Sequence, residues 1–433
     1  MLTAVEKQME LVVPLVRRLD GLVRDERRPA DAELAQIWRA HREWGARDRR
    51  FFGDAVFAFF RWRGWLADLL PERWPTAVAA ACWLDALPHP AALGLRTQAG
   101  LTAPLAVRLP AVRPSNPSAA SLSDKARELA AMLKVQPPRA PAQLVPAWVP
   151  ELLVQPDGLS PSAALTQYLE SFQSRPPLWL RMAPQAVPAA LAFFNQPTPR
   201  AAAHPVLTDA VRVAGAVDLN GLRKAVGAVF EAQDLSAQCV GRVCAPQPGA
   251  RWWDACAGAG GKALHLAALM HNRGTILATD VRAAALGELR RRAAAAGATI
   301  IRTRRSEPTR ENFDGVLVDA PCSGLGTWNR NPDMRWRTTA AAIAACATTQ
   351  RQLLAQAAAR VQPAGVLVYA VCTVTRAETT DMVHDFLGRH PDYQPDRFPH
   401  PLTGREVCGA AWVWLWDGPC GGMFIARMRR TGG

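Results

Sequence analysis

The chain has 433 residues, of which 49% are hydrophobic and 20% are charged. This composition is ordinary for a soluble globular protein, and the length suffices for two or three domains with cores of their own. No uncharged apolar run is long enough to span a bilayer, so a transmembrane helix is not expected. Lys and Arg exceed Asp and Glu by 14. This excess favours a polyanionic partner such as nucleic acid, although a basic surface without a function is the alternative interpretation.

The nine cysteines stand at irregular spacings, and no CxxC pair occurs among them. The sequence therefore predicts neither a zinc site nor a disulfide framework. Free thiols indicate a reducing compartment, and the amphipathic N-terminal segment lacks the apolar core of a signal peptide. We therefore predict a cytoplasmic protein that has no membrane partner and no metal site.

The first hundred residues predict a helical domain, because apolar residues recur at steps of three and four positions. Aromatic residues expected in its core are Phe51, Phe57, Phe60 and Trp65. Arginines that either contact RNA or line a solvated helix face are Arg47, Arg49, Arg50, Arg61 and Arg63. A stretch rich in Pro, Ala and Ser follows at residues 102–147 and surrounds one short predicted helix at 125–133. We assign residues 1–140 to this helical domain and its linker.

Residues 148–238 predict a small mixed segment, with strands at PPLWLRM and AVRVAG and a helix at LTQYLESF. In residues 239–433, strand candidates such as TILATD and FDGVLVDA alternate with helical stretches. This alternation predicts an α/β domain built on a parallel, doubly wound sheet. Ligands bind at the carboxyl ends of the strands in such sheets, so the residues that follow each strand are the informative ones.

A glycine-rich loop, DACAGAGGK, follows the first of these strands. Gly258, Gly260 and Gly261 permit a sharp turn and a close approach to a ligand. The loop matches neither a nucleotide P-loop nor the GxGxxG fingerprint of NAD enzymes, and a purely structural turn is the alternative. Asp280 ends the second strand, where an acid either accepts hydrogen bonds from the ribose of an adenosine cofactor or caps the next helix. The loop and Asp280 together favour a nucleoside cofactor.

Two cysteines follow neighbouring strands at the same edge of the predicted sheet. Asp319 ends the fourth strand, Cys322 comes three residues later, and Cys372 ends the fifth. Each cysteine alone reads as a small buried hydrophobic residue. Two together beside an acid indicate chemistry on cytosine, because a thiolate that adds to C6 makes C5 able to take a methyl group. The acid would hold N3 or the exocyclic amine, and the second cysteine would help to remove the C5 proton and break the adduct.

The segments DACAGAGGK, ATD, VLVDAPCSGLGTWNRNPDMRW and LVYAVCTVTRAET resemble the successive motifs of the RsmB/Sun (Fmu) family of RNA (cytosine-5)-methyltransferases. FEAQDLSAQ and GGMFIARMRR resemble the flanks of the same domain, and PLWLRM resembles the start of its small RNA-binding region. GARDRRFFGDAVFAFFRWRGWL resembles the NusB-like helical domain of bacterial members. The resemblance implies a class I (Rossmann-like) methyltransferase domain with an all-helical N-terminal domain and a small α+β RNA-binding segment. It also implies S-adenosylmethionine as cofactor and RNA as partner, with 16S ribosomal RNA as the expected target.

The resemblance implies roles for single residues. Cys372 matches the attacking thiol, Cys322 the thiol that assists product release, and Asp319 the acid that contacts the target base. The positions that match the cofactor-binding segments are Cys256, Ala257, Gly258, Ala259, Gly260, Gly261, Lys262, Asp280 and Asp319. Candidate RNA contacts are Arg181, Arg330 and Arg335, and Trp328 and Trp336 either stack on RNA or pack in a core.

The chain departs from the family pattern in the cofactor loop and beside the later cysteine, at Ala259, Val371 and Thr373. The acid usual after the third strand is replaced by Arg304 or Arg305, with Glu307 nearby. A second hypothesis is therefore an inactive RNA-binding or ribosome-assembly factor that retains the fold. Transfer RNA is the alternative target, an NAD-linked oxidoreductase is disfavoured by the broken glycine fingerprint, and a monomer is expected.

Overall fold

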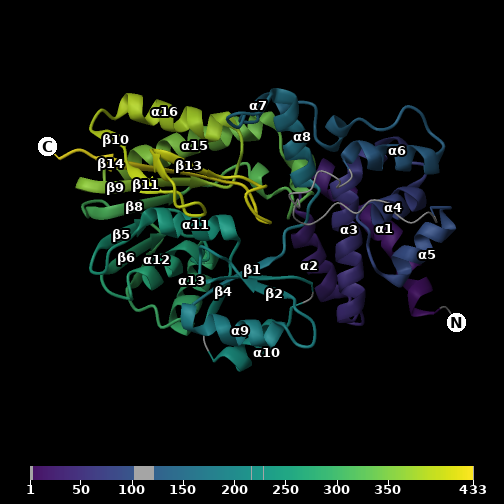
Figure 1. Ribbon diagram of the computed structural model, residues 1–433, viewed down its shortest axis with the longest axis horizontal. Coiled ribbons are helices and arrows are strands. Elements are labelled where there is room, and N and C mark those ends of the chain that lie inside the picture. Colours follow the sequence, from purple (N-terminus) through teal and green to yellow (C-terminus); the bar gives the residue numbers. More distant parts are fainter. Residues whose placement is uncertain (1–2, 102–120, 216, 228, 433) are drawn as a thin grey trace. The chain divides into compact units, whose positions relative to one another are not determined.

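The computed structural model describes residues 3–101, 121–215, 217–227 and 229–432 (Figure 1). The chain forms two compact units. The first consists of Met1–Arg175 together with Thr327–Ala340, and the second of Pro176–Gly326 together with Ala341–Gly433. The segment predicted at 148–238 is divided between these units, and residues 102–120 of the predicted 102–147 linker lie outside the described residues. The three predicted domain boundaries stay a prediction.

The first unit is helical, which confirms the fold predicted for the N-terminal region. Its α-helices are α1 (Ala4–Asp25), α2 (Ala30–Ala40), α3 (Ala46–Leu66), α4 (Trp74–Leu84), α5 (Pro90–Gln98), α6 (Leu122–Leu133), α7 (Val149–Leu152), α8 (Pro161–Phe172) and α14 (Met334–Arg337). Helix α1 begins with a capping box, in which Thr3 and Glu6 satisfy each other's backbone amides. Helix α3 is buried around most of its circumference, including Phe51, Phe60 and Trp65. The resemblance to a NusB domain stays a prediction.

Two arginines of α3 are buried ion-pair partners rather than RNA contacts. Arg61 is 1% exposed and lies 2.5 Å from the carboxylate of Asp85, and Arg63 lies 2.5 Å from that of Asp20. An arginine buried with its carboxylate partner has no free face for phosphate. Both alternatives given for these two residues, an RNA contact and a solvated helix face, are therefore wrong.

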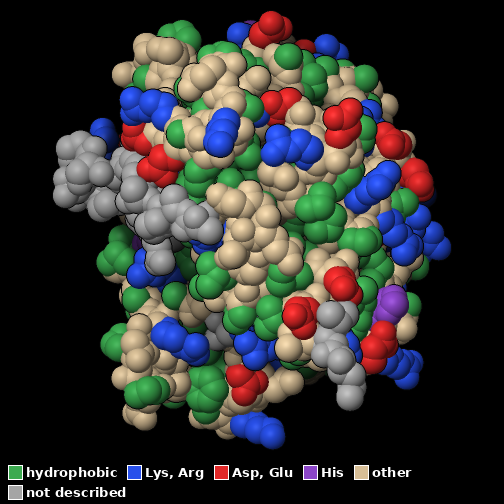
Figure 2. All heavy atoms as spheres, turned by 90° about the vertical axis from the view of Figure 1, so that its right-hand side faces the viewer, with side chains coloured by type: hydrophobic (Ala, Val, Ile, Leu, Met, Phe, Trp, Pro, Cys, Tyr) green, Lys and Arg blue, Asp and Glu red, His purple; other side chains and the backbone are tan. Residues whose placement is uncertain are grey.

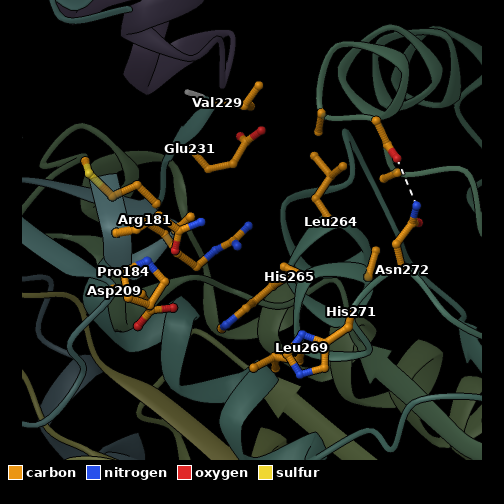
Figure 3. Close-up of a pocket in the computed structure, with 18 of the residues that line it drawn as sticks. Arg181, Pro184, Asp209, Val229, Glu231, Leu264, His265, Leu269, His271 and Asn272 are labelled. Carbon is orange, nitrogen blue, oxygen red and sulfur yellow. Dashed lines mark hydrogen bonds between the residues drawn. The ribbon is translucent and has the colours of Figure 1, made fainter. Parts of the chain in front are cut away.

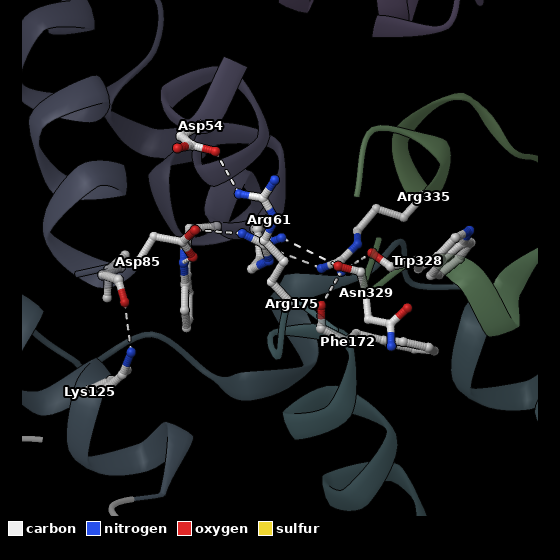
Figure 4. Close-up of polar contacts among 11 residues, drawn as sticks. Asp54, Arg61, Asp85, Lys125, Phe172, Arg175, Trp328, Asn329 and Arg335 are labelled. Atoms are coloured by element: carbon white, nitrogen blue, oxygen red, sulfur yellow. Dashed lines mark hydrogen bonds and ion pairs between the residues drawn. The ribbon is translucent and has the colours of Figure 1, made fainter. Parts of the chain in front are cut away.

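The loop that joins β8 to α15 packs within the helical unit through Arg335, which is 0% exposed (Figure 4). One terminal nitrogen of its guanidinium donates to the carbonyls of Arg61 and Leu144, at 3.2 and 3.1 Å. The other donates to the carbonyls of Phe172 and Trp328, at 3.0 and 3.4 Å. These bonds use the planar fork of donors that only arginine offers. The prediction that Arg335 contacts RNA is wrong, and its role is structural.

The tryptophans of the same loop also pack inside the first unit. Trp328 is 0% exposed and its ring lies 5.4 Å from that of Phe172. The indole nitrogen of Trp336 donates to the carbonyl of Phe60 at 2.7 Å. Of the two interpretations of Trp328, core packing is therefore the correct one.

The second unit is built on a large mixed sheet with the strand order β10-β14-β9-β8-β5-β6-β7, and β13 pairs with β14. Its parallel strands are β5 (Arg251–Asp254), β6 (Thr275–Thr279), β7 (Ile301–Arg304), β8 (Phe313–Asp319) and β9 (Val361–Val371). Its antiparallel strands are β10 (Tyr393–Pro395), β13 (Ala410–Val413) and β14 (Met423–Arg430). The predicted doubly wound α/β sheet is confirmed. A separate hairpin pairs β11 (Arg397–Pro399) with β12 (Glu406–Cys408).

Helices cover both faces of this sheet (Figure 1). On one face lie α11 (Leu235–Cys244), α12 (Gly261–Leu269) and α13 (Ala283–Ala295), and on the other lie α15 (Ala340–Ala358) and α16 (Thr380–Arg389). The alternation of side chains along β8 sends Leu317 to the first core and Val316 and Val318 to the second. Both faces are therefore buried, as expected for a parallel sheet.

A small sheet in the second unit has the order β2-β3-β1-β4. Its strands are β1 (Leu178–Met182), β2 (Ala201–Ala203), β3 (Ala210–Val213) and β4 (Phe230–Ala232), and its helices are α9 (Val187–Phe194) and α10 (Leu219–Val226). The predicted strands PPLWLRM and AVRVAG are β1 and β3. The predicted helix LTQYLESF is α8, which belongs to the first unit.

The surface shown in Figure 2 carries Lys and Arg side chains interspersed with Asp and Glu. The excess of 14 basic residues is thus not gathered into one continuous patch on this face. Among the residues that the structure describes, none of the helices is long and apolar enough to cross a bilayer.

Candidate active site

The carboxyl ends of β8 and β9 bring the two predicted cysteines together. The strands are parallel neighbours, with Asp319 in register with Ala370, so the turn after each strand begins at the same edge. The sulfur atoms of Cys322 and Cys372 lie 3.4 Å apart. Both side chains are partly buried. The juxtaposition predicted from strand order is therefore present in the structure.

The two thiols differ in acidity. A hydrogen bond from the Cys322 thiol lowers the pKa of Cys372, and the nearby Lys262 ammonium acts in the same direction. The same hydrogen bond, together with burial, raises the pKa of Cys322 well above its ordinary value. Because the thiolate is the nucleophile, this asymmetry favours Cys372 as the attacking residue and leaves Cys322 as a proton-bearing neighbour.

An ion pair lies beside the thiols. The Lys262 ammonium is 2.6 Å from a carboxylate oxygen of Asp319. Burial opposes the charge of Lys262, but the adjacent Asp319 carboxylate raises its pKa above the ordinary value. Lys262 is the last residue of the glycine-rich segment DACAGAGGK and lies in the first turn of α12, and Asp319 is the last residue of β8. This ion pair therefore joins the predicted cofactor loop to the acid predicted to contact the base.

Glu378 is a buried residue that the sequence motifs did not single out. Its carboxylate is 0% exposed and accepts the Ser323 amide at 2.8 Å and the Thr375 hydroxyl at 2.7 Å. Its further donors are the hydroxyls of Ser323 and Thr373 and the amide of Gln350. Ser323 directly follows Cys322, and Thr373 directly follows Cys372. Glu378 therefore ties together the two turns that carry the thiols.

The glycine loop has the geometry of a nucleoside cradle. The Gly258 amide donates to Asp280 at 2.9 Å, and Gly258 has a φ of 54°. Gly260 has a φ of 88°, and a Cβ there would lie 2.0 Å from Leu289 of α13. Glycine is thus required at 260 for close helix packing, and Asp280 is fixed next to the loop. These are the residues that would hold the adenosine part of the predicted cofactor, and Arg282 also bonds to Asp280.

Asp254, at the end of β5, is 0% exposed, and burial raises its pKa to about 7. The Asp254 carboxyl is therefore still protonated in the folded state at pH values where it is already ionised in the unfolded chain. The free energy of unfolding should fall as pH rises from the unfolded value of about 3.9 toward 7, by about 1.4 kcal/mol per pH unit.

We expect an Asp254→Asn variant to gain stability relative to the wild type as pH rises, because asparagine does not titrate. The gain should amount to about 2 kcal/mol between pH 5 and pH 7, because the Asp254 carboxyl is already half ionised in the folded state at pH 7. Urea unfolding of both proteins at a series of pH values measures it. Parallel stability curves for the two proteins over this range would contradict the raised pKa.

The loop after β7 carries Arg304 and Arg305 at the place where the family has an acid, and Glu307 is its acid near Cys256 of the glycine loop. Arg304 forms two bonds to Glu311, at 3.2 and 3.3 Å, and Arg305 donates to the carbonyl of Val281 at 3.5 Å. Glu307 is exposed. The basic character predicted for this loop is thus present.

Arg181, a predicted RNA contact, is 6% exposed and lines a cavity of ≈ 840 Å³ (Figure 3). Figure 3 shows Arg181, Asp209 and Glu231 on one wall of this cavity and His265 on the facing wall. The Arg181 side chain donates to Gln233 at 2.8 Å. Of the predicted RNA contacts, only Arg330 lies on the surface.

Residues 242–429 match the family model 16S rRNA methyltransferase RsmB/F. The chain is 33% identical over 303 residues to the "Probable ribosomal RNA small subunit methyltransferase B" of Synechocystis sp., which covers 66% of this chain and 67% of that protein. It is 35% identical over 212 residues to the protein of the same name from Bacillus subtilis, covering 46% and 47%. It is 34% identical over 196 residues to the human tRNA (cytosine(72)-C(5))-methyltransferase NSUN6, covering 41% of each. The chain thus spans two thirds of the first relative and less than half of the other two.

Two solved structures show the same fold. The crystal structure of PH0851 superposes with a TM-score of 0.70 over 99% of this chain and 100% of that one, at 19% identity. A methyltransferase homologue from Pyrococcus horikoshii gives a TM-score of 0.52 over 63% and 96%, at 22% identity. The sequence match to the Synechocystis relative and the family model agree with the motifs at the strand ends. The chain therefore belongs to the RsmB/Sun family of S-adenosylmethionine-dependent RNA methyltransferases.

Proposed function

We propose that this chain methylates C5 of a cytosine in 16S ribosomal RNA, with Cys372 as the nucleophile. The observation that carries the proposal is the thiol pair, whose sulfur atoms lie 3.4 Å apart. The hydrogen bond with Cys322 lowers the pKa of Cys372, which favours the Cys372 thiolate. S-adenosylmethionine supplies the electrophilic methyl group, and Gly258, Gly260 and Asp280 would hold it. The names of the ribosomal RNA relatives support the choice of target.

The first step forms a bond between the Cys372 sulfur and C6 of the cytosine. The electrons of the C5–C6 double bond then become available at C5. C5 would take the methyl group of S-adenosylmethionine as the bond from that methyl group to the sulfonium sulfur breaks, and S-adenosylhomocysteine would leave. The Asp319 carboxylate would accept a hydrogen bond from the exocyclic amine of the base, and its bond to Lys262 would hold it in position. The cytosine must leave its stack to reach this edge of the sheet.

The last step restores the aromatic base. The C5 proton passes to water, its bonding electrons re-form the C5–C6 double bond, and the bond between sulfur and C6 breaks. The departing Cys372 sulfur carries the negative charge, and the neighbouring Cys322 thiol stabilises that charge by donating a hydrogen bond. Cys322 thus assists release without attacking the base.

Bisulfite sequencing of RNA from a strain that lacks this gene tests the proposed target. One cytosine of 16S ribosomal RNA should lose its protection from conversion. The wild-type gene should restore protection, and a Cys372→Ala gene should not. Loss of protection in transfer RNA instead would assign the same chemistry to a different RNA. Unchanged protection in every RNA would contradict the proposal.

The second candidate is an RNA-binding or ribosome-assembly factor without methyl transfer, and the basic loop after β7 is the observation that favours it. Calorimetry with S-adenosylmethionine separates the two, since only the enzyme requires the cofactor. Cytoplasmic location and a monomeric state remain part of the proposal for the enzyme. All nine cysteines are free, in keeping with a reducing compartment.

A further inference from the structure

The carboxylate of Asp280 is fully occupied by donors of this chain. One oxygen accepts the Arg282 amide at 2.8 Å and its side-chain Nε at 3.0 Å. The other oxygen accepts the Gly258 amide at 2.9 Å and a terminal nitrogen of Arg282 at 3.0 Å. A carboxylate offers about four lone-pair sites, so these four bonds leave no acceptor free.

A ribose with two hydroxyl groups needs two acceptor sites on such an acid. The two backbone amides are fixed, because Gly258 belongs to the glycine loop and Arg282 is the residue at which α13 is capped. The Arg282 side chain is 69% exposed, whereas that of Asp280 is 6% exposed. The guanidinium is therefore the donor that can leave.

The Arg282 guanidinium also lies next to the glycine loop at Gly258. Its terminal nitrogen is 3.4 Å from the position that a Cβ would take on Gly258. The absence of a side chain at Gly258 leaves room for a ligand to approach the backbone. The Arg282 guanidinium, which bonds to Asp280, borders this space. Binding of the ribose and retention of the Arg282–Asp280 bonds are mutually exclusive in this geometry.

We infer that Arg282 sets the affinity for the cofactor by competing with the ribose hydroxyls for Asp280. The inference rests on the proposed role of Asp280 as the ribose acceptor. Removal of the side chain should strengthen binding about fivefold, because the ion pair is largely solvated and exposed pairs contribute little. High salt should weaken the competitor and so tighten cofactor binding to the wild type.

Calorimetric titration with S-adenosylhomocysteine tests this inference, since this ligand lacks the sulfonium charge that would complicate removal of an arginine. We expect Arg282→Ala to bind about fivefold more tightly than the wild type at low salt. The wild-type affinity should rise with added sodium chloride, and that of Arg282→Ala should not. Arg291→Ala is the matched control: it removes one arginine from α13, where Arg291 pairs with Glu288 rather than Asp280. Its affinity should equal that of the wild type.

Weaker binding by Arg282→Ala would overturn the inference and make Arg282 a clamp on the cofactor. Unchanged binding would equally overturn it. A second variant separates failure of the inference from failure of the underlying assignment. Asp280→Asn, introduced into the Arg282→Ala protein, should weaken binding, because it removes the ribose acceptor itself. If the double variant binds as tightly as Arg282→Ala, the proposed role of Asp280 as the ribose acceptor is wrong. The inferred competition by Arg282 is then wrong as well.

Discussion

A Cys322→Ala variant is expected to accumulate a covalent complex with its RNA that survives denaturing electrophoresis. The variant keeps the Cys372 nucleophile, so the bond to C6 still forms. It lacks the thiol that lies 3.4 Å from the departing sulfur, so release becomes slow. We expect turnover to fall by about 100-fold or more, which is the size of effect associated with a positioned proton donor.

Matched variants define the role of each cysteine. Cys372→Ala and the double variant should form no complex, because neither has the attacking thiol. Cys346→Ala changes another partly buried cysteine, on α15, and should behave as the wild type. A complex formed by Cys372→Ala but not by Cys322→Ala would reverse the two roles. Loss of the Cys322 donor should also raise the pKa of Cys372, so the rate of its alkylation at neutral pH should fall.

A Glu378→Ala variant is expected to lose both stability and methyl transfer. The substitution leaves the Ser323 amide, the Thr375 hydroxyl and their neighbours without their buried acceptor. Unsatisfied buried donors cost about 1–3 kcal/mol each, and rearrangement of the hydroxyls offsets part of this. We expect the free energy of unfolding to fall by about 3–5 kcal/mol, which chemical denaturation measures.

A Glu378→Gln variant is expected to fold, so its activity can be measured. The glutamine side chain has the same shape as glutamate, and its amide oxygen still accepts hydrogen bonds. We expect a smaller loss of stability, of about 1–2 kcal/mol. The maximal rate should fall about 100-fold through misplacement of the thiols, with little change in KM for RNA. Glu311→Gln, which changes a partly exposed acid paired with Arg304, should alter neither. A Glu378→Gln protein with full maximal rate would show that Glu378 does not position the cysteines.

The sheet and the meeting of the cysteines follow from chain order alone. Once strands and helices alternate, parallel strands place their carboxyl ends at one edge, and the residues after β8 and β9 become neighbours. Cys322, Cys372 and Asp319 could therefore be grouped from sequence. The glycine loop and Asp280 could be grouped in the same way, because β5 and β6 are adjacent.

The remaining features depend on contacts that periodicity does not encode. Arg335 looked like an exposed loop arginine, but its loop packs among helices that lie far away in sequence. The role of Glu378 could not be predicted, because five donors from three segments converge on it only in the folded chain. The pairing of Arg282 with Asp280 is a choice of side-chain conformation that sequence spacing leaves open.

The central claim is that this chain makes 5-methylcytidine in RNA through Cys372. Its most direct test is incubation of unmodified 16S ribosomal RNA with the enzyme and methyl-labelled S-adenosylmethionine, followed by complete digestion and identification of the labelled nucleoside. We predict label in 5-methylcytidine with the wild type and none with Cys372→Ala. Label in any other nucleoside, or equal label in 5-methylcytidine with Cys372→Ala, would contradict it.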